Sequence, residues 1–550
     1  MADWDRTVDV LVVGTGGAGL AAAMTAGDAG LEVLLVESTD RWGGSTSMSG
    51  GGIWLPANPL MQRDRAGDSR EEALTYLEEC VGDAGPATSR EHKEAFVDTV
   101  TPFVDLAERL GIRFARAADY PDYYPERPGG KVGRAIEVEP FDRKRIGAWW
   151  DSARAAIAGV PLPAKTDDFW LLGRAWSTPS GLARGAQLVG RTLAGAVTGK
   201  ALVGMGGAMT ASFLEVVLAQ GSQLWLSSPL SELVLEGDRV VGAVVERDGT
   251  PTRVEARRGV VLAAGGFAHR AAWRKEHHGI DGYSSASPGD LGTAIELAQG
   301  LGAAVDLMDD AWWGVSVPAP TPEDSPSFLV SERSYPYSIM VDATGERFAN
   351  ESESYVDLGH RMLEHGREVD GPFWMLSDAR HSRRYLRSFA LQPGLTARLR
   401  DAGLMRTAET VRGLAEQLEM DPERLLGTIR RFNGFARTGI DQDFGRGNSV
   451  YDRYYGDPLV RPNPNLGPLE YGPFTAVQVV PGDLGTKGGL VTDPDARVLR
   501  EDGGPIEGLY ASGNASASVM GRTYPGPGST LGPAVVFGYR AARHLAGAGS

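Results

Sequence analysis

The sequence predicts an α/β fold built around a parallel β-sheet. Residues 8–14 (VDVLVVG) form a run rich in β-branched residues, typical of a strand buried on both faces, and residues 31–38 (LEVLLVES) form a second such strand. Between them, GTGGAGLAAAMTAGDAG opens as a glycine-rich turn and continues as an alanine-rich helix, which we expect to end near Gly30. Strand, helix and strand in this order predict a parallel pair joined by a crossover helix.

The glycines of this turn have the spacing G-x-G-x-x-G, at Gly14, Gly16 and Gly19. The first allows a tight turn, the second lets a pyrophosphate approach the backbone, and the third lets the helix pack on the strand. The helix N-terminus offers free N–H groups and a positive dipole end to phosphates. Glu37 ends the second strand and can accept both hydroxyls of an adenosine ribose. These features together predict a Rossmann-like dinucleotide-binding unit.

A second glycine cluster identifies the dinucleotide as FAD. RWGGSTSMSGGGIW (41–54) has no role in a simple NAD-dependent dehydrogenase, but in FAD enzymes such a segment wraps the pyrophosphate and ribityl chain. RRGVVLAAGGF (257–267) and GLYASGNAS (508–516) are later strands ending in small residues, and no second strand–GxGxxG–helix unit occurs. We therefore expect one FAD site without a separate NAD(P)H site. The expected FAD-binding residues are Gly14, Gly16, Gly17, Ala18, Gly19, Glu37, Ser38, Gly44, Ser45, Thr46, Gly50, Gly51, Gly52, Ala264, Gly265, Asp290, Gly513, Asn514 and Leu531.

These segments are far apart in the chain, so the FAD-binding domain is predicted to be discontinuous. We expect its two parts at residues 1–285 and 477–550. Residues 286–476 shift towards aromatic residues, Arg and Pro, and are expected to form an inserted α+β catalytic domain that caps the substrate. Within it, SIMVDATGERF (338–348) predicts a β-hairpin.

Composition limits the partners and the compartment. The 550 residues include 71 Asp and Glu against 55 Lys and Arg, a net charge of −16 that argues against nucleic acid or an acidic membrane surface as partner. A single cysteine, Cys80, excludes an intramolecular disulfide and fits a reducing cytoplasm, where we expect the protein. No signal peptide or transmembrane segment is predicted. His277 and His278 lack a third ligand, so we expect them on the surface and no metal site.

A turn near the C-terminus contains candidate catalytic residues. Tyr524 is followed by Pro525-Gly526-Pro527-Gly528, and then by a helix whose N-terminus can face the flavin pyrimidine ring. A rigid turn of this kind can present the Tyr524 hydroxyl and the Gly528 N–H to one carbonyl oxygen, as an oxyanion hole does. The alternative is a tight turn with Tyr524 merely packed. Four aromatic residues could line an apolar pocket or belong to the core: Trp312, Trp313, Phe328 and Tyr335.

The sequence resembles flavoproteins of the fumarate reductase/succinate dehydrogenase superfamily and, within it, the 3-ketosteroid Δ1-dehydrogenases. The glycine motifs mark the superfamily, whereas TYPGPG together with LGTKGG marks the steroid enzymes. The matching segments are GTGGAGLAAA, GGSTSMSGGGIW, PDYYPERPGG (121–130), VDATGERFANESESY (341–355), LGTKGGLVTD (484–493) and TYPGPGSTLGP (523–533).

The resemblance implies a reaction and roles for four residues. Tyr524 and Gly528 would hold the steroid 3-keto oxygen and promote enolisation. Tyr355 would be the base that takes the C2 proton, assisted by Tyr123, with Tyr124 as the alternative because YPDYY leaves a one-residue ambiguity. Hydride would pass from C1 to flavin N5, forming a C1–C2 double bond, and an external acceptor would then reoxidise the flavin. Phenols suit an apolar pocket better than carboxylates, which are costly to bury in ionised form.

Three alternatives remain at this stage. A 3-ketosteroid Δ4-(5α)-dehydrogenase shares the ketone-holding logic but acts on C4–C5. A fumarate reductase-like enzyme would clamp a dicarboxylate with a His-Thr-x-Gly-Gly segment and an Arg, whereas this chain has Gly485-Thr486-Lys487-Gly488-Gly489 and places Pro525 near the position of that Arg. A flavin redox protein without turnover is the third. The histidine that links flavin in respiratory complexes is missing near Ser45 and Thr46, so we expect noncovalent FAD.

Overall fold

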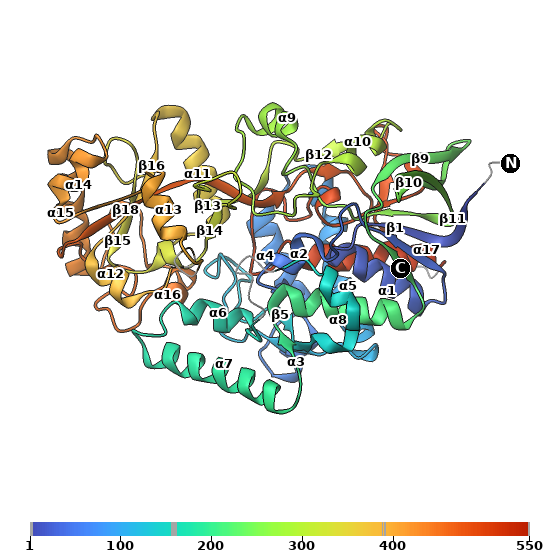
Figure 1. The fold of residues 1–550 in the computed structure, drawn as a ribbon, viewed down its shortest axis with the longest axis horizontal. Coiled ribbons are helices and arrows are strands. Elements are labelled where there is room, and N and C mark those ends of the chain that lie inside the picture. Colours follow the sequence, from blue (N-terminus) through green and yellow to red (C-terminus); the bar gives the residue numbers. More distant parts are fainter. Residues whose placement is uncertain (1–3, 156–161, 388, 390–391, 548–550) are drawn as a thin grey trace.

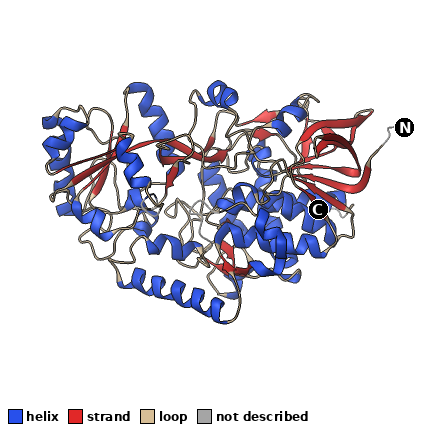
Figure 2. Ribbon diagram, in the orientation of Figure 1, coloured by secondary structure: helices blue, strands red, loops and turns tan. Residues whose placement is uncertain are grey.

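The computed structural model describes residues 4–155, 162–387, 389 and 392–547. Two large sheets lie at opposite ends of an elongated molecule, with most of the helices packed around and between them (Figures 1 and 2). The predicted α/β class, with a Rossmann-like part and a second α+β part, is confirmed.

The first sheet has eight strands and is parallel at its centre. Its main order is β20-β21-β11-β1-β2-β8, and β10 and β9 extend it from β11 as an antiparallel arm. Helices α1, α8 and α17 pack together against it. The strands are β1 (Arg6–Val13), β2 (Val33–Val36), β8 (Gln223–Trp225), β9 (Leu230–Glu236), β10 (Arg239–Arg247), β11 (Thr250–Leu262), β20 (Arg497–Leu499) and β21 (Pro505–Ala511).

The predicted first unit forms as expected. β1 and β2 pair in parallel, and α1 (Gly17–Asp28) connects them. All four residues of β2 and the last four of β1 are buried, because helices cover one face of the sheet and a second apolar core covers the other. The carboxyl ends of β1 and β2 therefore meet at one edge, directly beside the start of α1.

The second sheet is antiparallel and has six strands in the order β14-β13-β18-β16-β15, with β17 also paired to β18. Helices α11, α13, α14 and α15 pack on it. Its strands are β13 (Ala311–Val317), β14 (Ser327–Leu329), β15 (Ser338–Val341), β16 (Phe373–Ser377), β17 (Met405–Ala408) and β18 (Phe474–Thr486). β18 spans the predicted domain boundary at 476/477. α10 belongs to the predicted inserted domain but packs with the core of the first sheet. The boundaries at 285/286 and 476/477 stay predictions.

The hairpin predicted over 338–348 is wrong. β15 is followed by a turn closed by the Asp342 N–H, which donates to the Glu346 carbonyl at 3.0 Å, but β15 pairs with β16 instead of with the residues after the turn. Arg347 is drawn inward there by ion pairs to Glu351 (2.8 Å) and Asp441 (2.9 Å). The two carboxylates neutralise the buried charge of Arg347, and the residues after the turn do not pair with β15.

The remaining elements connect the two sheets and build their helical surroundings. Short strands are β3 (Ile53–Trp54), β4 (Phe114–Arg116), β5 (Ala135–Val138), β6 (Phe141–Asp142), β7 (Leu202–Val203), β12 (Val305–Asp306) and β19 (Gly489–Leu490). Helices are α2 (Gly44–Met48), α3 (Pro59–Arg63), α4 (Arg70–Val81), α5 (Arg90–Arg109), α6 (Thr166–Leu172), α7 (Pro179–Val197), α8 (Met205–Ala219), α9 (Ala271–Trp273), α10 (Thr293–Gln299), α11 (Tyr355–Glu368), α12 (Ala379–Arg384), α13 (Leu395–Asp401), α14 (Val411–Gln417), α15 (Pro422–Thr438), α16 (Val450–Tyr455) and α17 (Leu531–Leu545). No helix in the described part of the chain has the length and apolar character needed to cross a bilayer.

Candidate active site

The glycine turn after β1 has the geometry that a pyrophosphate requires. Gly14 adopts φ +104°, and a Cβ there would lie 2.3 Å from the carbonyl oxygen of Ala263. A Cβ on Gly19 would lie 2.0 Å from the Gly14 carbonyl oxygen, so this glycine is needed for the packing of helix on turn. At Gly16 a Cβ would meet only the Thr46 hydroxyl, at 3.7 Å, which leaves open space on the ligand side of the backbone.

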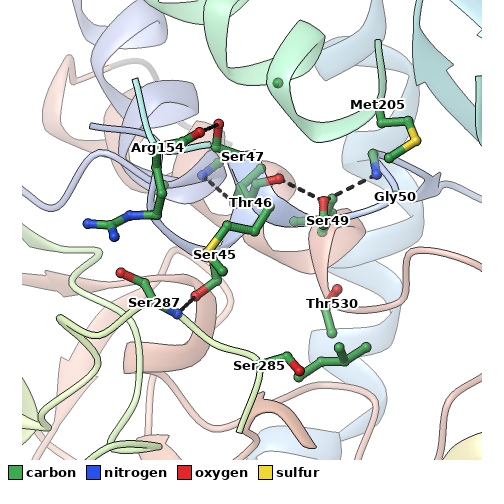
Figure 3. Close-up of a pocket in the computed structure, with 18 of the residues that line it drawn as sticks. Ser45, Thr46, Ser47, Ser49, Gly50, Arg154, Met205, Ser285, Ser287 and Thr530 are labelled. Atoms are coloured by element: carbon green, nitrogen blue, oxygen red, sulfur yellow. Dashed lines mark hydrogen bonds between the residues drawn. The ribbon is translucent and has the colours of Figure 1, made fainter. Parts of the chain in front are cut away.

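Hydroxyl groups of α2 line the opposite side of this space (Figure 3). The Thr46 hydroxyl accepts a hydrogen bond from the Gly17 N–H at 2.9 Å, and the Ser45 hydroxyl accepts one from the Ser287 N–H at 2.8 Å. Ser49 donates to the Thr46 carbonyl at 2.7 Å, which steadies the end of this short helix. α2 thus ties the first glycine turn to the loop that follows residue 284.

Two buried carboxylates line the cofactor cradle. Glu37 accepts hydrogen bonds from the Thr15 hydroxyl (2.5 Å) and from the Thr39 N–H and hydroxyl (3.1 and 3.0 Å). Asp290 is buried, and its Oδ2 has no hydrogen-bond partner. Burial raises the pKa of Asp290 to about 8, against a backbone hydrogen bond from Gly266 that lowers it. A buried carboxyl oxygen without a partner is costly, and a ribityl hydroxyl would satisfy it.

The residues present therefore fit FAD. One cavity of about 1250 Å³ is lined by 18 of the 19 residues expected to bind the cofactor. Gly19 is the exception and a correction: it lies beneath the turn, where the helix contacts Gly14, and does not line the cavity. The lining set is Gly14, Gly16, Gly17, Ala18, Glu37, Ser38, Gly44, Ser45, Thr46, Gly50, Gly51, Gly52, Ala264, Gly265, Asp290, Gly513, Asn514 and Leu531.

The same cavity continues to a group of tyrosines. Tyr123, Tyr355 and Tyr524 come from three separate segments and meet here, with ring centroids 5.4 Å apart for Tyr123–Tyr355, 5.0 Å for Tyr123–Tyr524 and 4.9 Å for Tyr355–Tyr524. All three are buried and line the cavity together with Gly528. Phe328 packs edge-on against Tyr355, with 5.3 Å between centroids, and also lines the cavity.

The turn that carries Gly528 is anchored on two sides. Gly528 has φ +97°, and a Cβ there would lie 2.1 Å from the Gly52 carbonyl oxygen. The Trp54 N–H donates to the Gly528 carbonyl at 3.2 Å, and the Tyr123 N–H donates to the Pro525 carbonyl at 2.8 Å. The backbone of Gly528 and the loop of Tyr123 are thereby held in fixed positions relative to one another.

Burial sets the protonation of these phenols. It raises the pKa of Tyr123 and of Tyr355 well above the usual value of 10. Burial also raises the pKa of Tyr524, but hydrogen bonds that its hydroxyl forms with Tyr355, Thr530 and the Gly528 backbone oppose the rise. In the Tyr355–Tyr524 contact the interaction raises the pKa of Tyr355 and lowers that of Tyr524. Tyr524 is thus favoured as the more acidic phenol and the stronger hydrogen-bond donor.

Tyr124, the alternative to Tyr123, does not line the cavity. Its hydroxyl donates to Asp357 Oδ1 at 3.0 Å and its N–H donates to the Tyr76 hydroxyl at 3.1 Å. The geometry therefore favours Tyr123 over Tyr124 for a role beside Tyr355.

Sequence reasoning missed further residues around this group. Tyr451 of α16 packs on Tyr123 with 4.3 Å between centroids, and Tyr120, which lines the cavity, stacks on Tyr454 at 4.7 Å. The available signal was the run VYDRYY (450–455), where tyrosines at i, i+3 and i+4 share a helix face. Its contact with residues near 120 depends on the tertiary fold.

Lys487 is the other missed residue. It is fully buried, 3.3 Å from Asp310 Oδ2 and 4.7 Å from the ring centroid of Trp312. Trp312 packs edge-on against Tyr524 (5.5 Å) and donates from Nε1 to Asn514 Oδ1 at 3.0 Å. Lys487 thus contacts the ring of Trp312, which in turn packs against Tyr524.

One expectation about another residue needs correction. His278 is buried, not on the surface, and its Nε2 lies 2.9 Å from the Met308 carbonyl. The described residues contain no cluster of His, Cys, Asp or Glu that could hold a metal ion. Of the four aromatic candidates, Phe328 lines the cavity, whereas Trp312, Trp313 and Tyr335 are buried and do not.

Comparison with known proteins agrees with this arrangement. Residues 9–531 match the family described as FAD binding domain. The chain is 41% identical to the 3-oxosteroid 1-dehydrogenase of Mycolicibacterium smegmatis over 98% of this chain and 97% of that protein. It is also 41% identical to the protein of the same name from Mycobacterium tuberculosis H37Rv, over 98% of both chains.

A solved structure shares the whole fold. The 3-ketosteroid Δ1-dehydrogenase of Sterolibacterium denitrificans, determined in complex with 1,4-androstadiene-3,17-dione, superposes with a TM-score of 0.91 at 37% identity. The alignment covers 99% of this chain and 100% of that one. With an FAD-binding cradle, a matching family over nearly its full length and relatives above 40% identity, the chain belongs to the 3-oxosteroid 1-dehydrogenase family of FAD-dependent flavoproteins.

Proposed function

We propose that this protein is an FAD-dependent 3-ketosteroid dehydrogenase that introduces a double bond between C1 and C2. The observation that carries the proposal is the convergence of Tyr123, Tyr355, Tyr524 and Gly528 in one cavity with the cofactor cradle. The names of the relatives, and the steroid in the structure of one of them, support the same substrate class.

Tyr524 and Gly528 are proposed to hold the ketone oxygen. Tyr524 and Gly528 line the same cavity and are separated by only three residues of one turn, so both donors can reach one carbonyl oxygen. Two donors on one oxygen stabilise the negative charge that develops there when the neighbouring C2–H is deprotonated. Removal of one such donor in other enzymes costs roughly 10²–10³ in rate.

Tyr355 is proposed as the base that takes the C2 proton. Its phenol lies against both Tyr524 and Tyr123 in a pocket where an ionised carboxylate would be costly. Polarisation of the ketone makes the C2 proton more acidic, and a nearby phenol oxygen can then accept it. Tyr123 is proposed to assist Tyr355 because it lies beside it in the same cavity, with the two rings edge to face at 5.4 Å and 81°.

The cofactor residues have a positioning role in this account. FAD, when bound, accepts the hydride that leaves C1. Gly14, Gly16 and the start of α1 would hold its pyrophosphate, Glu37 its adenosine ribose and Asp290 its ribityl hydroxyls. We expect the binding to be noncovalent, an external acceptor to receive the electrons, and the protein to work in the cytoplasm.

The alternatives have less support from this site. A dicarboxylate would need cations, but the charge of Lys487 is paired with Asp310. Lys487 contacts the ring of Trp312, and that ring packs against Tyr524. A redox protein without turnover would not require three phenols converging beside a backbone N–H. A Δ4-(5α)-dehydrogenase shares the ketone site, so the product must distinguish it.

The test is anaerobic reduction of the purified, FAD-loaded protein by androst-4-ene-3,17-dione. We expect loss of the flavin absorbance band and a product two hydrogens lighter with its new double bond at C1–C2, and no reduction by succinate. With 5α-androstane-3,17-dione as a second substrate, a first double bond at C4–C5 would support the Δ4 alternative. Reduction by succinate alone, or by neither compound, would contradict the proposal.

A further inference from the structure

Asp122 immediately precedes Tyr123 in the chain, and its carboxylate is buried with both oxygens in use. Oδ1 accepts a hydrogen bond from the Trp54 indole N–H at 2.7 Å, and Oδ2 accepts one from the Lys131 N–H at 3.0 Å and one from Arg134 at 2.9 Å. Burial raises the pKa of Asp122 to about 6, against the charge of Arg134 and the hydrogen bond from Trp54. At about pH 8 this group is therefore an anion whose orientation is fixed by three donors.

Trp54 connects this carboxylate to the turn that carries Gly528. Its indole bonds to Asp122, while its backbone N–H donates to the Gly528 carbonyl at 3.2 Å. A Cβ on Gly526 would lie 2.2 Å from two atoms of the Trp54 indole ring, so the backbone of the turn rests directly on that ring. Trp54 is fully buried and stacks on Phe96, with 6.0 Å between the ring centroids. A movement of the indole would therefore move the turn with it.

Tyr76 makes a second connection between the loop that holds Tyr123 and the turn that ends at Gly528. Its hydroxyl donates to the Pro525 carbonyl at 2.6 Å and accepts a hydrogen bond from the Tyr124 N–H at 3.1 Å. The Tyr123 N–H donates to the same Pro525 carbonyl, at 2.8 Å. Hydrogen bonds thus join the loop and the turn at two separate places.

The buried charges in this region fix directions more than they stabilise the fold. Arg134 is fully buried and pairs with Asp122 at 2.9 Å and with Asp68 at 2.7 Å. Removal of such charges from water costs about as much free energy as their attraction returns, so apolar side chains could stabilise the fold equally well. Hydrogen bonds to a carboxylate do, however, impose a definite geometry. Neither Trp54 nor Asp122 lines the cavity, so any effect on a substrate must pass through residues that do.

We propose that Trp54, Tyr76 and Asp122 are positioning residues for the ketone site. They set the place of the Gly528 N–H relative to the Tyr123 phenol. The carbonyls held by Trp54 and Tyr76 lie on either side of that N–H along the chain. This role rests on the proposed function, in which Gly528 polarises the ketone and Tyr123 assists the base. A displacement of about 1 Å in such a group can slow a reaction by about 10²-fold.

The ring-A carbonyl of a bound steroid reports the position of this donor directly. A hydrogen bond to a carbonyl oxygen weakens the C=O bond and lowers its stretching frequency, and only a well-aligned donor does so effectively. Androsta-1,4-diene-3,17-dione already has the C1–C2 double bond, so it can occupy the oxidised, FAD-loaded protein without turnover. Infrared difference spectra of the unlabelled dienone and of dienone labelled with heavy carbon at C3 isolate the C3 carbonyl band.

We expect this band at higher frequency in Trp54→Phe and in Tyr76→Phe than in wild type, because each variant keeps an aromatic ring but loses one hydrogen bond. Anaerobic flavin reduction by androst-4-ene-3,17-dione should slow by roughly tenfold to 10²-fold in both variants, with the FAD content unchanged. Tyr510→Phe is the matched control. It removes a buried tyrosine hydroxyl that lies 2.8 Å from His544 Nδ1, and it should leave both the band and the rate as in wild type.

Asp122→Asn, measured at about pH 8, tests the bond between indole and carboxylate. An amide has a single oxygen, so its NH2 group must face either the Trp54 indole or the donors of Lys131 and Arg134. In the Trp54→Phe background the NH2 group can face the side from which the donor has been removed. The loss of rate caused by Asp122→Asn should therefore be smaller in that background than in wild type. Equal losses in the two backgrounds would contradict a role for this bond.

Two further outcomes would overturn the proposal. One is a Tm that falls in Trp54→Phe and Tyr76→Phe while the carbonyl band and the rate stay at the wild-type values, which would be a purely structural role. The other is a slower rate with an unchanged band. If Trp54→Phe does not fold, Tyr76→Phe decides between these results. A wild type that neither binds the dienone nor is reduced by the steroid would contradict the proposed function itself, whereas an active wild type matched by both variants would contradict the positioning role alone.

Discussion

The rings of Tyr355, the first residue of α11, and Tyr524, from the turn before α17, lie 4.9 Å apart at an interplanar angle of 55°. Their contact raises the pKa of Tyr355 and lowers that of Tyr524. The pair thus divides into one phenol suited to donating a hydrogen bond and one whose oxygen becomes a strong base when ionised. This division corresponds to the two tasks of α-proton removal beside a ketone.

Tyr355→Phe tests the base. Because burial keeps the pKa of Tyr355 well above 10, the ionised fraction of wild type should increase throughout the range from about pH 6 to about pH 9, and the rate of anaerobic flavin reduction should increase with it. The variant should be slower by roughly 10²–10⁴ and lose this pH dependence. Tyr124→Phe is the matched control, since Tyr124 bonds Asp357 outside the cavity, and it should keep the wild-type profile. A Tyr355→Phe profile that rises with pH as in wild type would remove Tyr355 from this role.

Gly16→Ala and Gly19→Ala should fail in different ways. At Gly16 a Cβ has open space in the protein, so the apoprotein should unfold as wild type does, while the Kd for FAD rises about tenfold or more. At Gly19 a Cβ would lie 2.0 Å from the Gly14 carbonyl oxygen, so the free energy of unfolding should fall by about 1–3 kcal/mol. Denaturant unfolding and FAD titration measure the two effects. Equal losses of stability in the two variants would contradict the placement of Gly16 beside the pyrophosphate.

Asp290→Asn should change how stability depends on pH. The pKa of Asp290 is about 8 in the folded protein and near the ordinary 3.8 when unfolded. Between these values the folded state holds a proton that the unfolded state releases, so this group makes the apoprotein less stable as pH rises from about 4 to about 8. Asparagine cannot titrate, so the drop in Tm from pH 6 to pH 8 should be smaller in the variant. An identical drop in both proteins would show that Asp290 titrates normally.

Lys487→Met should destabilise the fold by breaking a buried ion pair. Burial raises the pKa of Asp310, but the Lys487 charge and a hydrogen bond with His360 outweigh it and lower that pKa to about 2. Removal of one partner leaves a buried charge uncompensated, which costs about 3–5 kcal/mol in unfolding free energy. Lys487→Met/Asp310→Asn should recover part of that loss. No recovery in the double variant would mean that Lys487 acts through its contact with Trp312 rather than through Asp310.

Local sequence motifs were sufficient to predict which residues line the cofactor cradle. Gly14 has a backbone conformation that favours glycine, with φ +104°, and the motif spacing alone identified both Gly14 and Gly16. The parallel pairing of β1 and β2 followed from two apolar runs. The roles of Tyr123 and Tyr355 came only from a family resemblance, because neither position has a local pattern. Adjacent loop residues can point in opposite directions, which is why Tyr123 and Tyr124 could not be separated by sequence.

Long-range packing explains what could not be predicted. Tyr451 meets Tyr123 only because α16 folds back on the loop near residue 120. The expected hairpin failed because Arg347 finds Glu351 and Asp441, the second of which is far along the chain. His278 was expected on the surface because the sequence places no third metal ligand near it, but it packs edge-on against Trp313 at 5.1 Å.

The most direct test of the central claim is the single-turnover rate of Tyr524→Phe with androst-4-ene-3,17-dione under anaerobic conditions. The account predicts that flavin reduction slows by roughly 10²–10³ while FAD remains bound at the wild-type level, because one donor to the ketone oxygen is lost and the ring that packs on Trp312 is kept. Tyr471→Phe, an exposed tyrosine, should reduce at the wild-type rate. A near-normal rate for Tyr524→Phe would contradict the claim that Tyr524 polarises the ketone.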